Sequence, residues 1–160
     1  YLIERDDDRD AFERIFMDTE LRLAAWVWID LDGVFDIPDG ELEAFNTQLG
    51  TRYRDLLLFQ GEHRFQRDAS NLFLGDVTLL PGRPWVFSAY GRYQAEESRL
   101  EEIGGYVQRN LDCLAVRTSC AIMPGFTRDD GSQRDDEWRV GLELWLTDFP
   151  ETQIGARYRN

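Results

Sequence analysis

The side chains that could carry acid–base or nucleophilic chemistry are few. The 160-residue chain has one histidine, His63, two cysteines, Cys113 and Cys120, and no lysine. A single histidine excludes metal sites that need two or three imidazole ligands, and the absence of lysine excludes a Schiff base or a phosphate-loop lysine. No GxSxG sequence surrounds Ser70 or Ser88, so we interpret His63 as a solvated turn residue and expect no cofactor.

Two aspartates, Asp30 and Asp32, lie close together in a sequence motif typical of some phosphatases. The segment 25–36, AWVWIDLDGVFD, places Asp30 and Asp32 after an apolar strand and before Gly33. It resembles the first motif of haloacid-dehalogenase-type phosphatases. That resemblance implies Asp30 as nucleophile, Asp32 as acid/base and Mg²⁺ between the carboxylates and the phosphate. The other interpretation is an acidic hairpin tip, and otherwise we expect no metal site.

The two cysteines are expected to be unpaired. Both lie among apolar neighbours, and no CxxC spacing or larger cysteine set indicates a zinc ribbon or a disulfide framework. Buried free thiols are the favoured interpretation, and they suggest a reducing, cytoplasmic compartment.

Charge and aromatic content indicate how the chain could bind a partner. The 18 basic residues, all arginine, against 31 acidic ones give a net charge of −13, which argues against nucleic-acid binding. No apolar run reaches the roughly 18 residues of a membrane span, so no membrane partner is expected. We predict a basic protein partner, contacted by these tryptophans and by acids of the polar loop 127–137: Trp26, Trp28, Trp145, Asp129, Asp130, Asp135 and Asp136.

Apolar spacing of three or four residues predicts helices in three segments. The first covers 9–19, with Phe12, Ile15 and Phe16 on one face. The second opens at Pro38-Asp39, carries Leu42, Phe45 and Leu49, and is capped by Gly50. The third covers Ala95–Leu111, with Leu100, Ile103, Val107 and Leu111 in register and Gly104-Gly105 inside it.

Strands are predicted between these helices by alternating apolar residues. They cover Leu21–Leu31, Tyr53–Gln60, part of Phe65–Leu80, Trp85–Tyr93, Ala115–Met123 and Trp138–Thr147, with a turn at Pro81-Gly82. On the last strand Trp145 should face away from Leu144 and Leu146. The loop 127–137 should connect the last two strands as a hairpin.

These elements predict an α+β fold. We expect one globular domain over 1–160, with a helix–strand extension over 1–38 and a core over 39–147. Its mostly antiparallel sheet of five to seven strands should carry two or three helices on one face.

Two resemblances agree with a helix, three strands, helix, two strands order after residue 39. Segment 89–147 resembles the YbjN/type III secretion chaperone-like family through Tyr90-Gly91-Arg92-Tyr93, Glu96, Glu97, Asn110, Asp129-Asp130-Gly131, Glu143 and Asp148. That resemblance implies a small acidic protein that binds other proteins. A second resemblance, to the cap-binding initiation-factor fold, is carried by Phe35-Asp36, Phe45-Asn46, Trp85, Leu144-Trp145 and Ile154-Gly155.

Taken together, these patterns predict a non-enzymatic acidic binding module. It would neutralise or chaperone a basic protein, in the manner of an immunity protein or a secretion chaperone, with homodimer formation left open. The alternatives are a small Mg²⁺-dependent phosphohydrolase using Asp30 and Asp32, and a cap-binding-like fold.

Overall fold

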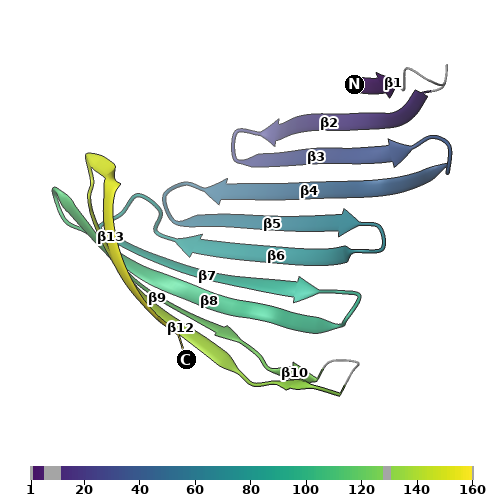
Figure 1. Ribbon diagram of the computed structural model, residues 1–160. Helices are drawn as coiled ribbons and strands as arrows, with labels where there is room; N and C mark the ends of the chain where they lie inside the picture. Colours follow the sequence, from purple (N-terminus) through teal and green to yellow (C-terminus); the bar gives the residue numbers. More distant parts are fainter. Residues whose placement is uncertain (1, 6–11, 128–130, 160) are drawn as a thin grey trace.

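The computed structural model describes residues 2–5, 12–127 and 131–159, and these residues form strands and turns without any helix (Figure 1). The thirteen strands are β1 (Leu2–Arg5), β2 (Phe12–Ala24), β3 (Val27–Asp36), β4 (Glu41–Tyr53), β5 (Leu57–Gln66), β6 (Ser70–Leu79), β7 (Trp85–Gln94), β8 (Arg99–Asn110), β9 (Leu114–Met123), β10 (Phe126–Thr127), β11 (Gln133–Arg134), β12 (Glu137–Leu146) and β13 (Phe149–Arg159). The predicted α+β class is therefore wrong.

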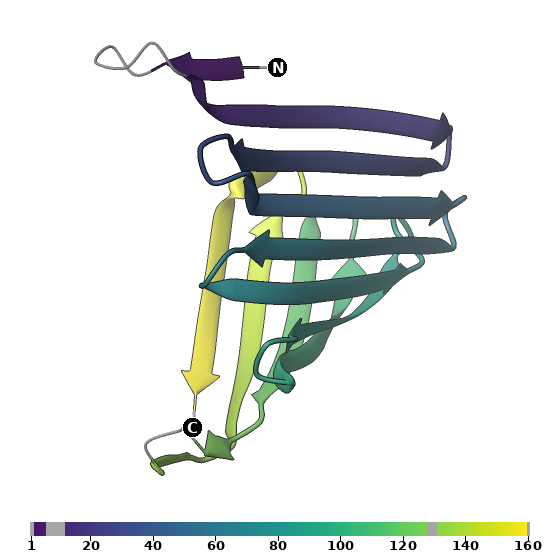
Figure 2. The same ribbon diagram turned by 90° about the vertical axis from the view of Figure 1, so that its right-hand side faces the viewer.

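Eleven of the strands form one antiparallel sheet in the order β1-β2-β3-β4-β5-β6-β7-β8-β9-β12-β13. Each strand pairs with the one before it in the chain, except that the short β10–β11 hairpin intervenes between β9 and β12. The sheet is a single twisted layer: in Figure 2 the strands β3–β5 run across the view, whereas β12 and β13 run down it. Within the described part of the chain, no second layer covers either face of this sheet (Figures 1 and 2).

The three predicted helices are extended strands, and β-bulges explain why their spacing looked helical. In β4, Ala44 pairs with Val34 and Leu42 with Phe35, so Glu43 has no partner in β3. An extra residue changes the alternation of side chains. Leu42 and Phe45 therefore share one face although they are three residues apart.

A β-bulge also occurs in each of the other two segments. In β8, Leu100 pairs with Tyr93 and Glu102 with Arg92, which leaves Glu101 unpaired and puts Leu100 and Ile103 on one face. In β2, the register skips Glu13 between its pairs with β1. Predicted helix 9–19 thus overlaps β2 from residue 12 onward, with residues 9–11 outside the described part. Predicted helix 95–111 is a turn followed by β8.

Most strand predictions are confirmed in type, with shifted bounds, but the predicted strand Tyr53–Gln60 is the end of β4, a turn over 54–56 and the start of β5. The two last predicted strands correspond to β9 and β12, and Trp85–Tyr93 corresponds to β7. The predicted strand 21–31 is two strands, β2 and β3, joined by a tight turn at Ala25 and Trp26. The turn at Pro81-Gly82 is confirmed, and Gly82 has a φ of 80° there.

The described residues contain almost no apolar core. Only Val86, Ala115 and Ala121 are buried apolar residues, and no large side chain is fully buried. A domain of this length in water normally buries a substantial apolar core. Within the described ranges, no helix is long and apolar enough to cross a membrane.

Candidate functional site: two faces of one sheet

Strand β12 shows most clearly that the two faces of the sheet differ. Trp138, Val140, Leu142, Leu144 and Leu146 point to one face and are 38–46% exposed. Between them, Glu137 and Glu143 point to the other face and are only 9% exposed. The apolar side chains of this strand are thus more exposed than its carboxylates.

The register of the strands extends this alternation across the sheet. Leu142 pairs with Thr118, which pairs with Val107, and residues that pair across strands point to the same face. Following the pairs from β12 through β7 to β2 therefore gives one continuous side of the sheet. We call this side the apolar face. Its large members include Ile15, Met17, Leu21, Val27, Ile29, Leu31, Phe35, Leu42, Phe45, Leu49, Tyr53, Leu57, Phe59, Phe65, Phe73, Val77, Leu79, Trp85, Phe87, Tyr93, Leu100, Ile103, Val107, Leu114, Val116, Ile122, Trp138, Val140, Leu142, Leu144, Leu146, Ile154 and Tyr158.

Aromatic rings gather at both margins of the apolar face. One margin follows the short turns, of two to five residues, that begin after β2, β4, β6, β8 and β12; it carries Tyr53, Phe59, Trp85 and Phe87. The opposite margin, which includes the 124–136 connection, carries Phe35, Phe45, Phe65, Phe73, Tyr93, Trp138 and Tyr158. Between the margins lie aliphatic residues, small residues and the in-register glycines Gly61, Gly75 and Gly91.

Charged groups are almost absent from the apolar face. Among its described paired residues from Ile15 to Leu146, Arg109 is the one charged side chain, and its guanidinium lies 4.8 Å from the ring centre of Trp85 at the short-turn margin. His63 is near the other margin. Its ring stacks on Phe73 at 4.4 Å and its Nε2 lies 2.8 Å from Asn71 Oδ1. The predicted solvated turn histidine is therefore a partly buried strand residue.

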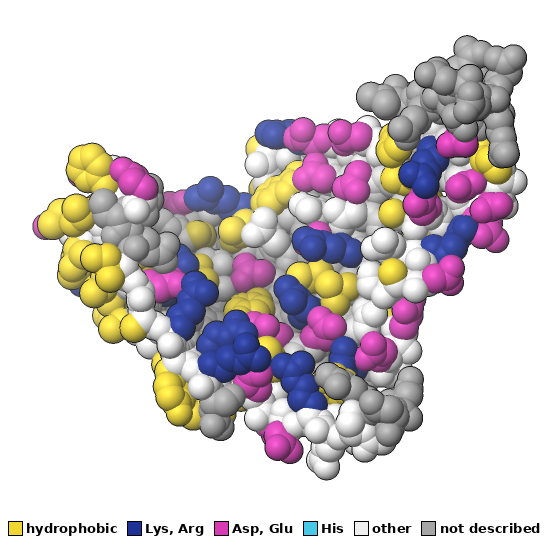
Figure 3. All heavy atoms as spheres, in the orientation of Figure 1, with side chains coloured by type: hydrophobic (Ala, Val, Ile, Leu, Met, Phe, Trp, Pro, Cys, Tyr) yellow, Lys and Arg dark blue, Asp and Glu magenta, His cyan; other side chains and the backbone are white. Residues whose placement is uncertain are grey.

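The opposite side, which we call the polar face, holds a network of ion pairs. Glu143 accepts a hydrogen bond from Arg157 at 3.2 Å and lies 3.7 Å from Arg117, which also contacts the rings of Tyr106 and Trp145. Glu137 pairs with Arg159 and Arg134, and the hydrogen bond from Arg159 holds the pKa of Glu137 below its usual value. Figure 3 shows basic and acidic side chains spread over the hollowed side of the sheet.

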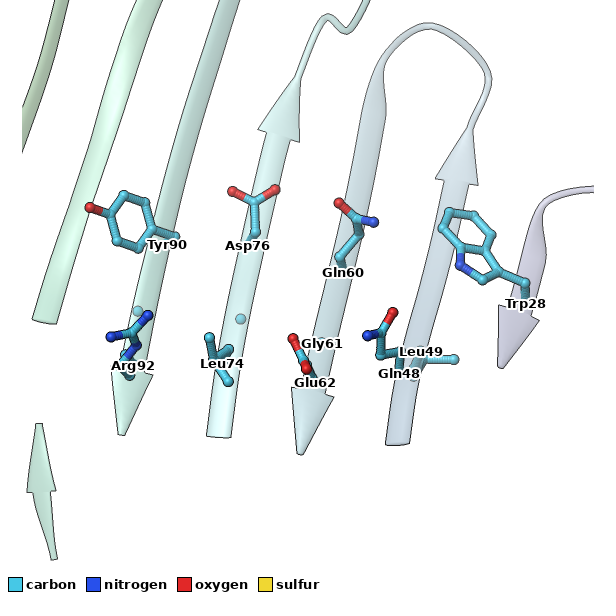
Figure 4. A pocket seen from close by; sticks show the side chains of 12 residues that line it. Trp28, Gln48, Leu49, Gln60, Gly61, Glu62, Leu74, Asp76, Tyr90 and Arg92 are labelled. Atoms are coloured by element: carbon cyan, nitrogen blue, oxygen red, sulfur yellow. The ribbon is translucent and has the colours of Figure 1, made fainter. Parts of the chain in front are cut away.

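A groove of about 250 Å³ lies on the polar face over β3 to β7 (Figure 4). Two rows of registered residues form it: Gln60, Asp76 and Tyr90 in one row, and Gln48, Glu62, Leu74 and Arg92 in the next. Trp28 closes one side. The row positions follow from the two-residue period of each strand, which puts every second residue on the same face.

Two aromatic rings in the groove lie flat over glycines of neighbouring strands. A Cβ at Gly50 would meet the Trp28 ring, and a Cβ at Gly104 would come within 2.8 Å of the Tyr90 ring. The glycines permit this close approach. The Tyr90 hydroxyl donates a hydrogen bond to Glu102 at 2.5 Å, and burial together with that bond raises the pKa of Tyr90 to about 12.

The predicted binding residues do not form one patch. Trp28 and Trp145 lie on the polar face of strands far apart in the sheet order, and Trp145 faces away from Leu144 and Leu146 as predicted. Trp26 is in a turn and is 58% exposed. Asp135 and Asp136 are exposed at the far end of β12, roughly 30 Å of strand from Trp145. Asp129 and Asp130 lie outside the described residues.

The remaining chemical candidates are separated in the same way. Asp30 and Asp32 lie in the middle of β3 on the polar face, where Asp32 accepts a hydrogen bond from Asn46 at 3.1 Å. Among the described residues, no three His, Cys, Asp or Glu side chains are grouped so as to hold a metal ion. All strand pairings among the described residues are antiparallel. Cys113 and Cys120 are unpaired as predicted, but both are exposed, so their predicted burial is wrong.

Sequence reasoning missed Gln48, Gln60, Asp76, Tyr90 and Arg92. A partial signal was present for Gln60, Asp76, Tyr90 and Arg92, which occupy alternate positions with apolar residues or glycine on either side. The sequence matches no protein-family model and no curated protein sequence.

Proposed function

We propose that this sheet spans a lipid bilayer, with the apolar face toward the acyl chains and the polar face bordering a water-filled passage. The observation that carries the proposal is the uncovered apolar face, which continues over ten strands while nearly all charged groups lie on the other side. Soluble proteins rarely expose apolar patches larger than a few hundred Å².

The length of the strands fits a bilayer. β5, β6, β7, β9 and β12 each have ten residues, and membrane-spanning strands need about 9–11 residues when tilted by about 45°. At a rise of about 3.3 Å per residue, such a strand is about 33 Å long and covers an apolar band of about 25 Å when tilted.

The positions of the aromatic rings give independent support. Tryptophan and tyrosine side chains favour the boundary between lipid and water, because one part of the ring system is apolar and another forms hydrogen bonds. The apolar face has such rings at both strand ends, including Tyr53 and Trp85 at one margin and Tyr93, Trp138 and Tyr158 at the other. A surface that binds another protein has no need of two aromatic margins separated by the length of a strand.

A sheet that spans a bilayer cannot leave the edges of its outer strands unpaired in lipid. Backbone N–H and C=O groups in lipid must be hydrogen-bonded within protein. β1, the part of β2 beyond β1, and β13 each have an edge that pairs with no described strand. These edges must pair with further strands in the membrane.

This proposal competes with the functions predicted from the sequence. The acidic module that binds a basic protein, and its cytoplasmic location, stay predictions, and so does the absence of enzymatic activity. The apolar face would then be covered by protein instead of lipid. The two explanations differ in what the native cysteines contact.

The native cysteines test the proposal without a mutation. Cys113 lies in a short turn at one margin, whereas Cys120 lies opposite Val140 in the middle of the apolar face. After reconstitution into phosphatidylcholine liposomes, a water-soluble maleimide should label Cys113 readily and Cys120 at least about tenfold more slowly.

The matched control moves the thiol by one residue. In the Ser119→Cys, Cys120→Ser double variant the thiol lies on the polar face, and it should react at a rate close to that of Cys113. The proposal is wrong if Cys120 in liposomes reacts as fast as Cys113, or if the protein does not float with the lipid in a density gradient.

A further inference from the structure

The groove on the polar face has features of a binding site and not only of a sheet surface. Its volume of about 250 Å³ lies just below the roughly 300 Å³ at which small-molecule sites begin. Figure 4 shows its side chains rising side by side from five successive strands, with Trp28 at one side and Tyr90 and Arg92 at the other.

Two amide side chains in the groove are free to bind a ligand. Gln48 and Gln60 form no side-chain hydrogen bond with any other described residue, and both are exposed. Each amide offers both a donor and an acceptor.

The neighbouring carboxylates are held in place. Asp76 accepts hydrogen bonds from Ser88 at 2.7 Å and from Thr78 at 3.2 Å, and Glu62 pairs with Arg64. Arg92 reaches Glu101 only at 4.0 Å, so its guanidinium keeps donors for the groove.

The indole of Trp28 presents a flat apolar surface beside these polar groups. The ring lies directly over Gly50, where a Cβ would meet it, so it packs against the backbone of β4. A flat indole next to paired amides and carboxylates suits a ligand that has one apolar face and a rim of hydroxyl groups. A hexopyranose ring has that form: its axial C–H bonds make the apolar face, and its hydroxyls both donate and accept.

We propose that the groove binds a neutral linear oligosaccharide of hexopyranose units, with one sugar ring stacked on Trp28 and its hydroxyls bonded to Gln48, Gln60 and Asp76. Neutrality follows from the balance of charges at the groove, where Asp76 and Glu62 are matched by Arg92 and Arg64. An anionic ligand would meet the two carboxylates without a surplus of positive charge. The inference deepens the proposed function, because it names a solute for the water-filled side of the sheet.

The test is calorimetric titration of the full chain, folded in detergent micelles, with maltohexaose, cellohexaose and chitohexaose. At least one of the three should bind the unmodified protein. Trp28→Leu should weaken that binding by about tenfold, because the stacking surface is lost. Trp28→Tyr keeps an aromatic plate and should stay within about threefold of the unmodified protein.

Two control variants separate the groove from the rest of the sheet. Gln60→Leu should weaken binding, whereas Gln66→Leu, on the same strand and face but outside the groove, should leave it unchanged. Trp85→Leu, on the apolar face, should also bind normally.

The inference is overturned if none of the three sugars binds, if Trp28→Leu binds like the unmodified protein, or if a polygalacturonate hexamer binds more tightly than all three neutral sugars. Slow labelling of Cys120 in liposomes would leave the membrane proposal intact in each of these cases, so the two failures are distinguishable.

Discussion

Neighbouring residues of one strand experience opposite surroundings on the two faces of this sheet. On β12, Leu142 is 46% exposed while Glu143 beside it is 9% exposed and bound to arginines. In water-soluble proteins the apolar member of such a pair is the buried one. This difference indicates that the side chains of the polar face form the ion pairs and hydrogen bonds within the molecule. The apolar face must be covered by something outside the chain, either lipid or another protein.

The largest expected effect comes from a charge introduced at adjacent positions on β4. Leu49→Arg places a guanidinium in the middle of the apolar face, and Gln48→Arg places one on the polar face. In phosphatidylcholine liposomes we expect Leu49→Arg to lower the free energy of unfolding by about 2–4 kcal/mol and Gln48→Arg to change it by less than about 0.5 kcal/mol. Equilibrium unfolding in guanidinium chloride, followed by tryptophan fluorescence, measures both. Equal small effects would mean that water covers the two faces alike.

The next effect tests the bonding of the polar face. Glu143→Gln removes the charge that holds Arg117 and Arg157 and should lower the free energy of unfolding by about 2 kcal/mol, because two guanidinium groups lose their partner in a partly buried place. Glu20→Gln is the matched control, since its pair with Arg22 is solvent-exposed and should be worth less than about 1 kcal/mol. A larger loss for the exposed pair would contradict the internal role of the Glu143 network.

A smaller effect sharpens the comparison at two glycines. Gly104→Ala brings a methyl group within 2.8 Å of the Tyr90 ring and of the Cys120 carbonyl oxygen. It should cost about 1–2 kcal/mol and disturb the hydrogen bond from Tyr90 to Glu102. Gly75→Ala, on the apolar face, has open space around its new methyl group and should change stability by less than about 0.5 kcal/mol. The same unfolding experiment compares the two variants.

The smallest expected effect is a titration. The pKa of Tyr90 is raised to about 12 by burial and by its bond to Glu102, whereas an unfolded tyrosine ionises near pH 10. The folded state therefore holds this proton more tightly. The resulting stabilisation is complete below about pH 10 and is lost as the pH rises toward 12. Absorbance at 295 nm should show one late-ionising phenol that disappears in Tyr90→Phe; an unchanged titration in that variant would assign the late step elsewhere.

The bulges decide how much of the fold could be read from the sequence. Strands with unbroken alternation, such as β12, were predicted with their faces, because a two-residue period leaves no helical alternative. Leu42 and Phe45, and Leu100 and Ile103, imitate a helical turn because Glu43 and Glu101 each add one residue to a strand. A single sequence does not distinguish such a bulge from the first turn of an amphipathic helix, and so three of the strands were predicted as helices.

The candidate site could not be predicted from the sequence for a different reason. Trp28, Gln48, Gln60, Asp76 and Arg92 come from five strands, and their proximity depends on the register between neighbouring strands, which one strand does not encode alone. Trp145 was assigned to the correct face, but the idea that it joins Trp28 and Asp135 in one surface assumed a compact molecule. A single extended layer keeps them apart.

The sequential order of the strands also bears on how the chain reaches its folded state. Apart from the interruption by β10 and β11, every pairing among the described strands joins strands that are consecutive in the chain, and none of these strands contacts a distant one. Closing such short loops costs little entropy, so the sheet can grow by adding one hairpin after another. The cost of this route is that each partly grown sheet presents a fresh unpaired edge, and only the arrival of the next strand removes it.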